Sequence, residues 1–274
     1  MLNKRVATLL MGTILMGSLA VGCGSSDSSN SNKITISGST SVGPVVEILG
    51  EDFEAKNEGV SIEVQQIGSS AGIKNAIDGT SQIGMASRDL KDEEKSELKE
   101  YQIAIDGIAV ITNSANKVKD LTLDQVKDIY TGKITNWKEV GGNDADIVVV
   151  SREDGSGTRD GFQEIVGFES GDLTSNAQIS DGSGNIKTTV QGNENAIGYI
   201  SFGYLDDSIN SVKIGGVEPK EENVYNKKYP ISRPFLLVTK GDATGDAKSF
   251  IDYVLSDEGQ KTIEKEGFMS VNQK

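Results

Sequence analysis

Three short turns combine glycine with serine or threonine, and each follows an apolar run and precedes an amphipathic one. They cover residues 37–41 (SGSTS), 68–72 (GSSAG) and 154–158 (DGSGT). Where a strand leads into a helix, the first helical amides have no partner and the helix dipole adds partial positive charge. Hydroxyls supply further donors, and glycine lets an anion approach the backbone. Helix capping alone would explain any one of these turns. Three of them together predict a shared site for a small oxyanion.

Arg152 stands just before the third turn, in the sequence SREDGSGTR. Its guanidinium can hold two oxygens of a tetrahedral anion in parallel, and the nearby Asp154 carboxylate can fix the plane of that guanidinium. The alternative is that Arg152 forms only an ordinary ion pair at the surface and binds no anion. None of the three turns matches the G-x-x-x-x-G-K-S/T or the G-x-G-x-x-G pattern, so the sequence does not favour a nucleotide as the ligand.

The segments that must position these turns alternate short apolar runs with amphipathic stretches, which predicts an α/β fold. We expect strands at residues 33–37, 60–66, 83–87, 103–112, 146–151, 196–201, 211–214 and 229–239. We expect helices at residues 42–57, 71–78, 91–101, 121–130, 157–166, 186–191, 246–255 and 258–265. Each turn would then lie at the carboxyl end of a strand. The runs at 103–112 and 229–239 would suit a chain that leaves one domain and later returns to it.

The composition excludes several classes of protein. Of 274 residues, 41 are acidic, 27 are basic and none is histidine, so catalysis or metal binding through an imidazole is excluded. One cysteine allows no internal disulfide and no multi-cysteine zinc site. A net charge of -14 argues against a nucleic-acid partner, because surfaces that bind nucleic acid carry an excess of Lys and Arg. We expect no metal, no cofactor and no catalytic residue.

The first 22 residues are typical of a secretory signal peptide, with basic residues at positions 4 and 5 followed by an uncharged, largely apolar run. Residues 19–23 (LAVGC) resemble the lipobox of bacterial lipoproteins, whose cysteine is acylated, for example with palmitate, and this predicts lipidation at Cys23. A plain signal peptide, or an anchor helix with an incidental cysteine, is the alternative. Residues 23–32 would then be the lipidated cysteine and a flexible polar tether.

Nearly all of the chain after this tether resembles the phosphate-binding proteins of high-affinity phosphate ABC importers. The resemblance depends first on the RxDGSGT block at residues 152–158 and on GSSAG at 68–72. Further blocks occur in the usual order of the family: GSTS at 38–41, IGMASR at 83–88, AIGY at 196–199 and LSDEGQ at 255–260.

This resemblance implies a two-domain periplasmic-binding-protein fold of the venus-flytrap type (type II), with two crossover strands, that closes over one dehydrated phosphate. Domain 1 would comprise residues 33–107 and 236–274, and domain 2 would comprise residues 108–235. The implied phosphate ligands are Thr40, Ser41, Ser69, Ser87, Arg152, Ser156, Gly157 and Thr158.

One position departs from the pattern of the family. Many members carry an aspartate just after the third strand, where it accepts the proton of phosphate, but this chain has Ser87 followed by Arg88. A site made only of donors suits sulfate as well as phosphate, so selection for phosphate needs an acceptor. Asp106 and Asp154 are the candidate proton acceptors, and an ordinary structural role is the alternative for each. The hydroxyl of Ser87 is a third candidate.

The resemblance therefore implies an extracytoplasmic receptor, lipid-anchored to the cell membrane, that captures inorganic phosphate and passes it to ABC permease subunits. It would act as a monomer and perform no chemistry of its own. Three alternatives stay open: a binder of another oxyanion such as sulfate or molybdate, a phosphate-sensing or adhesive lipoprotein without a permease, and a secreted phosphatase. In a phosphatase, Ser156 would need a base other than histidine.

Overall fold

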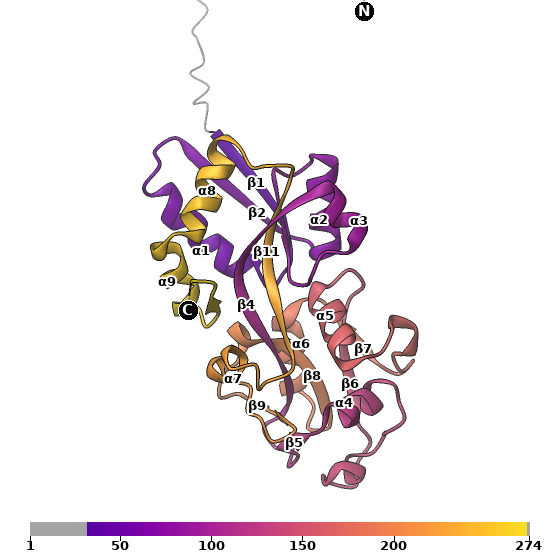
Figure 1. Ribbon diagram of the computed structural model, residues 1–274. Coiled ribbons are helices and arrows are strands. Elements are labelled where there is room, and N and C mark those ends of the chain that lie inside the picture. Colours follow the sequence, from indigo (N-terminus) through magenta and orange to yellow (C-terminus); the bar gives the residue numbers. More distant parts are fainter. Residues whose placement is uncertain (1–31, 273–274) are drawn as a thin grey trace, which may run out of the picture. The chain divides into compact units, whose positions relative to one another are not determined.

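Strands and helices alternate along residues 32–272, the part of the chain that this computed structural model describes (Figure 1). The predicted signal peptide and Cys23 lie outside the described residues. The chain begins with β1 (Asn32–Gly38), α1 (Gly43–Glu54), β2 (Val60–Gln66), α2 (Ser69–Asp78), β3 (Ile83–Ala86), α3 (Asp92–Glu97) and β4 (Leu98–Asn113). It continues with β5 (Asp120–Leu121), α4 (Leu123–Tyr130), β6 (Val148–Arg152), α5 (Gly157–Val166), β7 (Gln178–Ser180), α6 (Gly182–Gln191) and β8 (Ala196–Ser201). It ends with β9 (Ile209–Ser211), β10 (Lys213–Ile214), α7 (Glu221–Tyr225), β11 (Ser232–Lys240), α8 (Gly245–Leu255), α9 (Asp257–Lys265) and β12 (Met269–Ser270).

Most of these strands join one mixed sheet in the order β2-β1-β3-β11-β4-β8-β6-β7. The three strands β1, β2 and β3 are parallel to one another, and so are β6, β7 and β8. Between these groups, β11 is antiparallel to both β3 and β4. We call the part with β1–β3 and helices α1–α3, α8 and α9 lobe 1, and the part with β5–β10 and helices α4–α7 lobe 2.

Two strands connect the lobes (Figure 1). The 16-residue β4 pairs with β11 over its first half and with β8 and β9 over its second half. Strand β11 runs back beside β4, with Ser232 opposite Gly107 and Lys240 opposite Leu98. The register shifts once, between Phe235 and Leu236, where a bulge bends the ladder. The chain therefore passes between the lobes along two hydrogen-bonded strands.

Each lobe has its own hydrophobic core. In lobe 1, the main cluster joins apolar residues of β1 and α1 to Phe235 on β11 and to Phe250 and Ile251 on α8. In lobe 2, the cluster runs from Ile108 on β4 to Ile231, just before β11, and it also includes Met269 on β12. The predicted spacing of apolar residues in α1 is realised, because its buried face includes valine, leucine and phenylalanine at helical intervals. Chain segments far apart in the sequence thus share the core of lobe 1.

Two predicted elements differ from the structure. The predicted strand 211–214 is divided between β9, which pairs with β4, and β10, which pairs with β5. The charged stretch 91–101 was expected to be a single surface helix, but α3 ends at Glu97 and β4 begins at Leu98. The segment 98–102 pairs with the end of β11, which supplies the ladder hydrogen bonds that its polar sequence did not reveal. Within residues 32–272, no helix combines the length and the apolar character that crossing a bilayer requires.

Candidate anion-binding site

The three glycine- and hydroxyl-rich turns meet between the lobes. Two of them lead into α1 and α2 of lobe 1, and the third leads into α5 of lobe 2. The Ser41 and Thr158 hydroxyl oxygens are 2.9 Å apart, and the Ser70 amide donates to the Gly155 carbonyl at 3.1 Å. These contacts bring the ends of the helices together, as expected of turns at the carboxyl ends of strands.

A hydroxyl network fills the lobe 1 side of this junction. The Ser39 hydroxyl accepts the Ser41 and Val42 amides and donates to the Ser87 hydroxyl at 2.9 Å. The Ser69 hydroxyl accepts the Ser87 amide at 3.2 Å and lies 3.3 Å from the Ser87 hydroxyl. All of these serines are buried. Sequence reasoning missed Ser39, although it stands in the first turn, because its place beside Ser87 depends on two strands that are distant in the chain.

The start of α5 lies directly against this network. A Cβ atom on Gly157 would lie 2.3 Å from the Ser69 hydroxyl oxygen and 2.7 Å from that of Ser87, so only glycine fits here. Ser156 caps α5 by accepting the Arg159 amide at 3.3 Å. Among residues 32–272, the amides of Gly157 and Thr158 have no acceptor, as is usual for the first turn of a helix. These amides are available to an anion.

Arg152 enters the site from the end of β6 with one nitrogen uncommitted. Its side chain is 1% exposed, and its Nε and Nη2 each donate to a Glu153 carboxylate oxygen at 2.7 Å. Its Nη2 also donates to the Thr40 hydroxyl at 2.9 Å. The Nη1 atom is buried without a hydrogen-bond partner. Because an unpaired buried guanidinium nitrogen is costly, this atom indicates where a ligand oxygen belongs.

The carboxylate predicted to hold Arg152 is the wrong one. Asp154 pairs with Arg159 at 2.6 Å, and its side chain is 94% exposed. Glu153 takes the predicted role because its two oxygens face the guanidinium side by side. Burial alone would raise the pKa of Glu153, but the hydrogen bond and charge of Arg152 outweigh burial and lower this pKa.

Asp106 is fully buried at the point where β4 and β11 cross between the lobes. Its Oδ2 accepts two hydrogen bonds from Arg233, its cross-strand neighbour, at 2.8 and 3.1 Å. Its Oδ1 accepts the Ser201 hydroxyl at 2.9 Å and the Phe202 amide at 3.1 Å. Burial raises the pKa of Asp106, and the charge of Arg233 opposes that rise. With four donors on its two oxygens, Asp106 has its acceptor capacity filled.

All four arginines of residues 32–272 gather around this junction, and each has a carboxylate partner. The pairs are Arg88 with Glu94 and Asp160, Arg152 with Glu153, Arg159 with Asp154, and Arg233 with Asp106. The charge of each guanidinium is therefore largely compensated before any ligand binds. An anion would be held mainly by oriented hydrogen bonds and by helix dipoles, which suits a protein whose net charge is -14.

Two further residues contribute to the junction without having been predicted. The Tyr204 hydroxyl donates to the Thr40 carbonyl at 3.2 Å, and Arg233 donates to the Ser87 carbonyl at 3.0 Å. Arg233 stands in the run 229–239, which sequence reasoning treated only as a crossover. No local motif marks either residue, because both act through contacts between distant parts of the chain.

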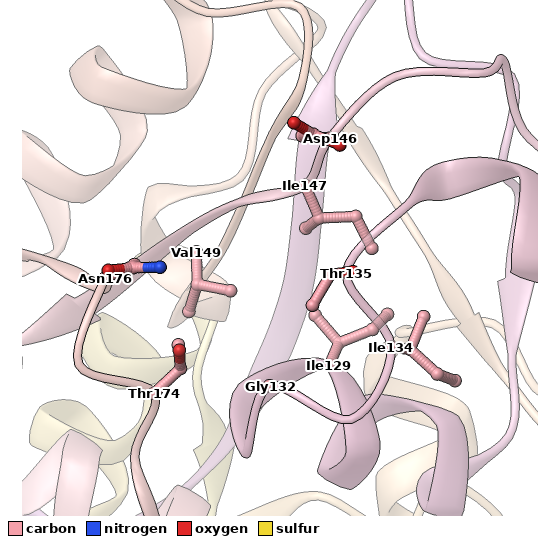
Figure 2. A pocket seen from close by; sticks show the side chains of 9 residues that line it. All are labelled: Ile129, Gly132, Ile134, Thr135, Asp146, Ile147, Val149, Thr174 and Asn176. Carbon is pink, nitrogen blue, oxygen red and sulfur yellow. The ribbon is translucent and has the colours of Figure 1, made fainter.

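A separate pocket of about 220 Å³ lies in lobe 2 (Figure 2). Its lining is mixed: Ile129, Ile134, Ile147 and Val149 are aliphatic, and the polar side chains include one carboxylate, Asp146. None of its nine lining residues is cationic or belongs to the predicted site. This pocket does not suit an oxyanion, because it contains a carboxylate and no cation.

The comparisons with known proteins agree with this geometry. A family model described as a PBP superfamily domain matches residues 24–258. The phosphate-binding protein PstS of Bacillus subtilis is 38% identical over 95% of this chain and 91% of its own length. PstS of Staphylococcus saprophyticus is 33% identical over 97% of this chain and 90% of its own length.

Solved structures show the same fold. A Clostridium perfringens crystal structure of a substrate-binding protein, assigned to a phosphate ABC transporter and containing bound phosphate, is 67% identical with a TM-score of 0.86. That alignment covers 88% of this chain and all of the other. An ABC-type phosphate transport receptor from Vibrio cholerae is 37% identical, with a TM-score of 0.76 over 87% of this chain and 99% of its own.

The predicted fold is therefore confirmed: a two-domain α/β periplasmic-binding-protein fold in which two strands cross between the domains. Three turns at helix N-termini, a buried arginine with a free nitrogen and the matched relatives all point to one family. The chain belongs to the PstS family of phosphate-binding proteins, within the PBP superfamily.

Proposed function

We propose that this protein is an extracytoplasmic solute-binding protein that captures inorganic phosphate between its two lobes and delivers it to the permease of an ABC importer. The observation that carries this proposal is the free Nη1 atom of Arg152, which is buried on a guanidinium whose Nη2 reaches across to Thr40 of the first turn. A small oxyanion would satisfy that nitrogen together with the amides of Gly157 and Thr158. The names of the matched relatives support phosphate as this oxyanion.

The residues proposed to bind phosphate divide by the lobe that supplies them. Lobe 1 would contribute hydroxyl and amide donors from Thr40, Ser41, Ser69 and Ser87. Lobe 2 would contribute the Arg152 guanidinium and the donors of Ser156, Gly157 and Thr158. Because donors from both lobes are needed, phosphate would bind the closed arrangement more tightly than an open one. We place the domain boundaries near 107/108 and 235/236. The hydrophobic clusters change from lobe 1 to lobe 2 between Ala104 and Ile108, and back to lobe 1 between Ile231 and Phe235.

Geometry favours Ser87 among the three candidates for the proton acceptor. Asp106 already accepts four hydrogen bonds, and Asp154 is exposed and paired with Arg159. The Ser87 hydroxyl lies inside the network, 2.9 Å from that of Ser39. A hydroxyl can accept one hydrogen bond while donating another, so it can face a protonated phosphate oxygen.

We further propose that the chain is anchored to the outer face of the cell membrane through a lipid on Cys23 and works as a monomer. The lipobox-like sequence before this cysteine supports the anchor. Sulfate or molybdate binding is the near alternative. A phosphatase is less well supported, because the Ser156 hydroxyl accepts the Arg159 amide and the chain has no histidine to serve as a base.

Calorimetric titration tests this function. We expect the purified protein to bind one phosphate per chain, and to bind sulfate and molybdate at least about 100-fold more weakly, a difference of about 2.7 kcal/mol. A phosphomonoester in the same assay should show no turnover. If sulfate or molybdate bound more tightly than phosphate, that anion would be the ligand of this protein. Steady release of phosphate from the ester would show that the protein is a phosphatase.

A further inference from the structure

Arg88 follows Ser87 directly and contacts both lobes. Its Nη1 and Nη2 atoms donate to the Glu94 carboxylate at 2.7 and 2.9 Å, and Glu94 belongs to α3 of lobe 1. Its Nε donates to the Asp160 carboxylate at 3.0 Å, and Asp160 belongs to α5 of lobe 2. The Arg88 side chain is 4% exposed, so a buried group makes both contacts.

Glu94 holds Arg88 in place independently of lobe 2. The Glu94 carboxylate also accepts the Lys91 amide at 2.8 Å, in the capping box at the start of α3. The paired geometry with Arg88 fixes the guanidinium plane, and Arg88 also donates to the carbonyl of Asp89 at 2.8 Å. Lobe 1 therefore presents the remaining Nε donor in a fixed direction, toward lobe 2. The bond to Asp160 is not needed to keep Arg88 ordered.

Asp160 occupies an unfavourable place for an anion-binding protein. It lies in the first turn of α5, whose opening amides are proposed to bind phosphate. A carboxylate there stabilises the helix but repels a second anion at the same helix end. Arg88 offsets this charge, and because it belongs to the other lobe, it does so only when the lobes are together.

We propose that Arg88 is a positioning residue that pairs with Asp160 to hold the lobes closed over the bound anion and thereby sets the rate of its release. This inference rests on the proposed function, because the anion is phosphate. In the open protein, Asp160 would keep its negative charge unpaired and discourage premature capture at α5 alone. On closure, the pair would form beside the ligand and favour the closed state.

The test is the rate of phosphate release from the full-length protein, measured by stopped flow after dilution or trapping. Asp160→Asn should release phosphate about 5- to 20-fold faster, with association no slower than in the parent, since the pair forms after encounter and the removed charge repels the anion. Asp160→Glu should stay close to the parent. A double-mutant cycle with Arg88→Gln should be strongly non-additive, because either change removes the same contact.

The direction of the change in release rate distinguishes this role from simple charge repulsion between Asp160 and the bound anion. Removing a negative charge beside an anion site would by itself tighten phosphate binding, so slower or unchanged release in Asp160→Asn overturns the inference. Asp206→Asn is the matched control, because the Asp206 ion pair with Lys187 lies within lobe 2, and it should leave release unchanged. If the parent protein binds no phosphate at all, the proposed function is wrong. The role proposed for Arg88 and Asp160 is then wrong as well.

Discussion

Arg152 shows how a single side chain can be held rigid and still keep a donor for a ligand. Glu153 takes the Nε and Nη2 edge of the guanidinium, Thr40 shares Nη2, and Nη1 is left buried without a partner. Because the carboxylate fixes the guanidinium plane, little side-chain entropy is lost when an anion binds. The arginine is thus oriented before the ligand arrives.

Arg152→Ala should therefore weaken phosphate binding by about 2 to 5 kcal/mol, or roughly 30- to 5,000-fold in dissociation constant. Arg152→Lys should recover only part of the loss, because an ammonium group cannot keep the paired contact with Glu153 and also present the Nη1 donor. Calorimetry with both variants measures the effect. Asp154→Asn serves as the control, since its exposed carboxylate pairs with Arg159, and it should bind within about threefold of the parent. If Arg152→Ala and Asp154→Asn lost the same amount of phosphate affinity, Arg152 would not be a specific ligand of the anion.

The sequence predicted Arg152 and the three turns, but not their detailed partners. Glycine and hydroxyl residues at a strand-to-helix junction have a local physical reason, so their spacing alone indicated an anion site. Which of two adjacent carboxylates faces the guanidinium depends on side-chain directions at the end of β6, and here Glu153 rather than Asp154 does so. Tyr204 approaches the site from a short 3-10 helix directly after β8, and nothing in its local sequence signals this.

At the scale of elements, the start of α5 in lobe 2 lies directly against lobe 1. Gly157 opens this helix, and the hydroxyls of Ser69 and Ser87 occupy the space where a side chain would stand. Farther along the same helix, a Cβ on Gly161 would meet its nearest atom, on Arg233, at 3.6 Å. Helix α5 therefore has one glycine with no room for a side chain, Gly157, and one with room for a methyl group, Gly161.

Gly157→Ala should weaken phosphate binding at least about 10-fold, because the added methyl would collide with hydroxyl oxygens of the other lobe and hinder closure. The first helical position tolerates alanine, so the midpoint of thermal unfolding without phosphate should change little. Gly161→Ala is the matched control on the same helix and should bind phosphate about as well as the parent. If both variants bind normally, α5 does not approach lobe 1 this closely in solution.

The same elements show where local patterns mislead. The apolar spacing of α1 predicted that helix well, because its buried face packs within its own lobe. The charged segment 98–102 resembles a surface helix and is a strand, because β11, more than 130 residues later in the chain, pairs with it. Hydrogen bonds between distant segments override local propensity there.

At the scale of the whole molecule, the lobes are connected by two strands and by the contacts around the site. The strands β4 and β11 share a ladder of residue pairs that one bulge interrupts, whereas the site contacts are individual hydrogen bonds such as Ser41 with Thr158. Rotation about the strands can break those site contacts while leaving the core of each lobe intact. Phosphate would favour the closed state because it adds donor contacts that only the closed state offers.

Small-angle scattering of residues 24–274 should therefore show a smaller radius of gyration with saturating phosphate than without it. The described part of this segment contains the hydrophobic cores of both lobes, so the shortened chain should fold. Sulfate at the same concentration should leave the radius near its ligand-free value. An unchanged radius at saturating phosphate would contradict capture by closure of the lobes.

Lobe 1 is built from two stretches of the chain that lie on either side of lobe 2, and this affects the order in which the lobes can fold. Its core combines residues from β1 and α1 with Phe235 and with residues of α8 and α9, whereas the core of lobe 2 is drawn almost entirely from 108–231. As the chain emerges from its amino end, lobe 2 has nearly all of its core before lobe 1 can bury α1. During that interval, the apolar face of α1 stays exposed to wrong partners. A truncation near the carboxyl end would remove core from lobe 1 while leaving that of lobe 2 almost complete.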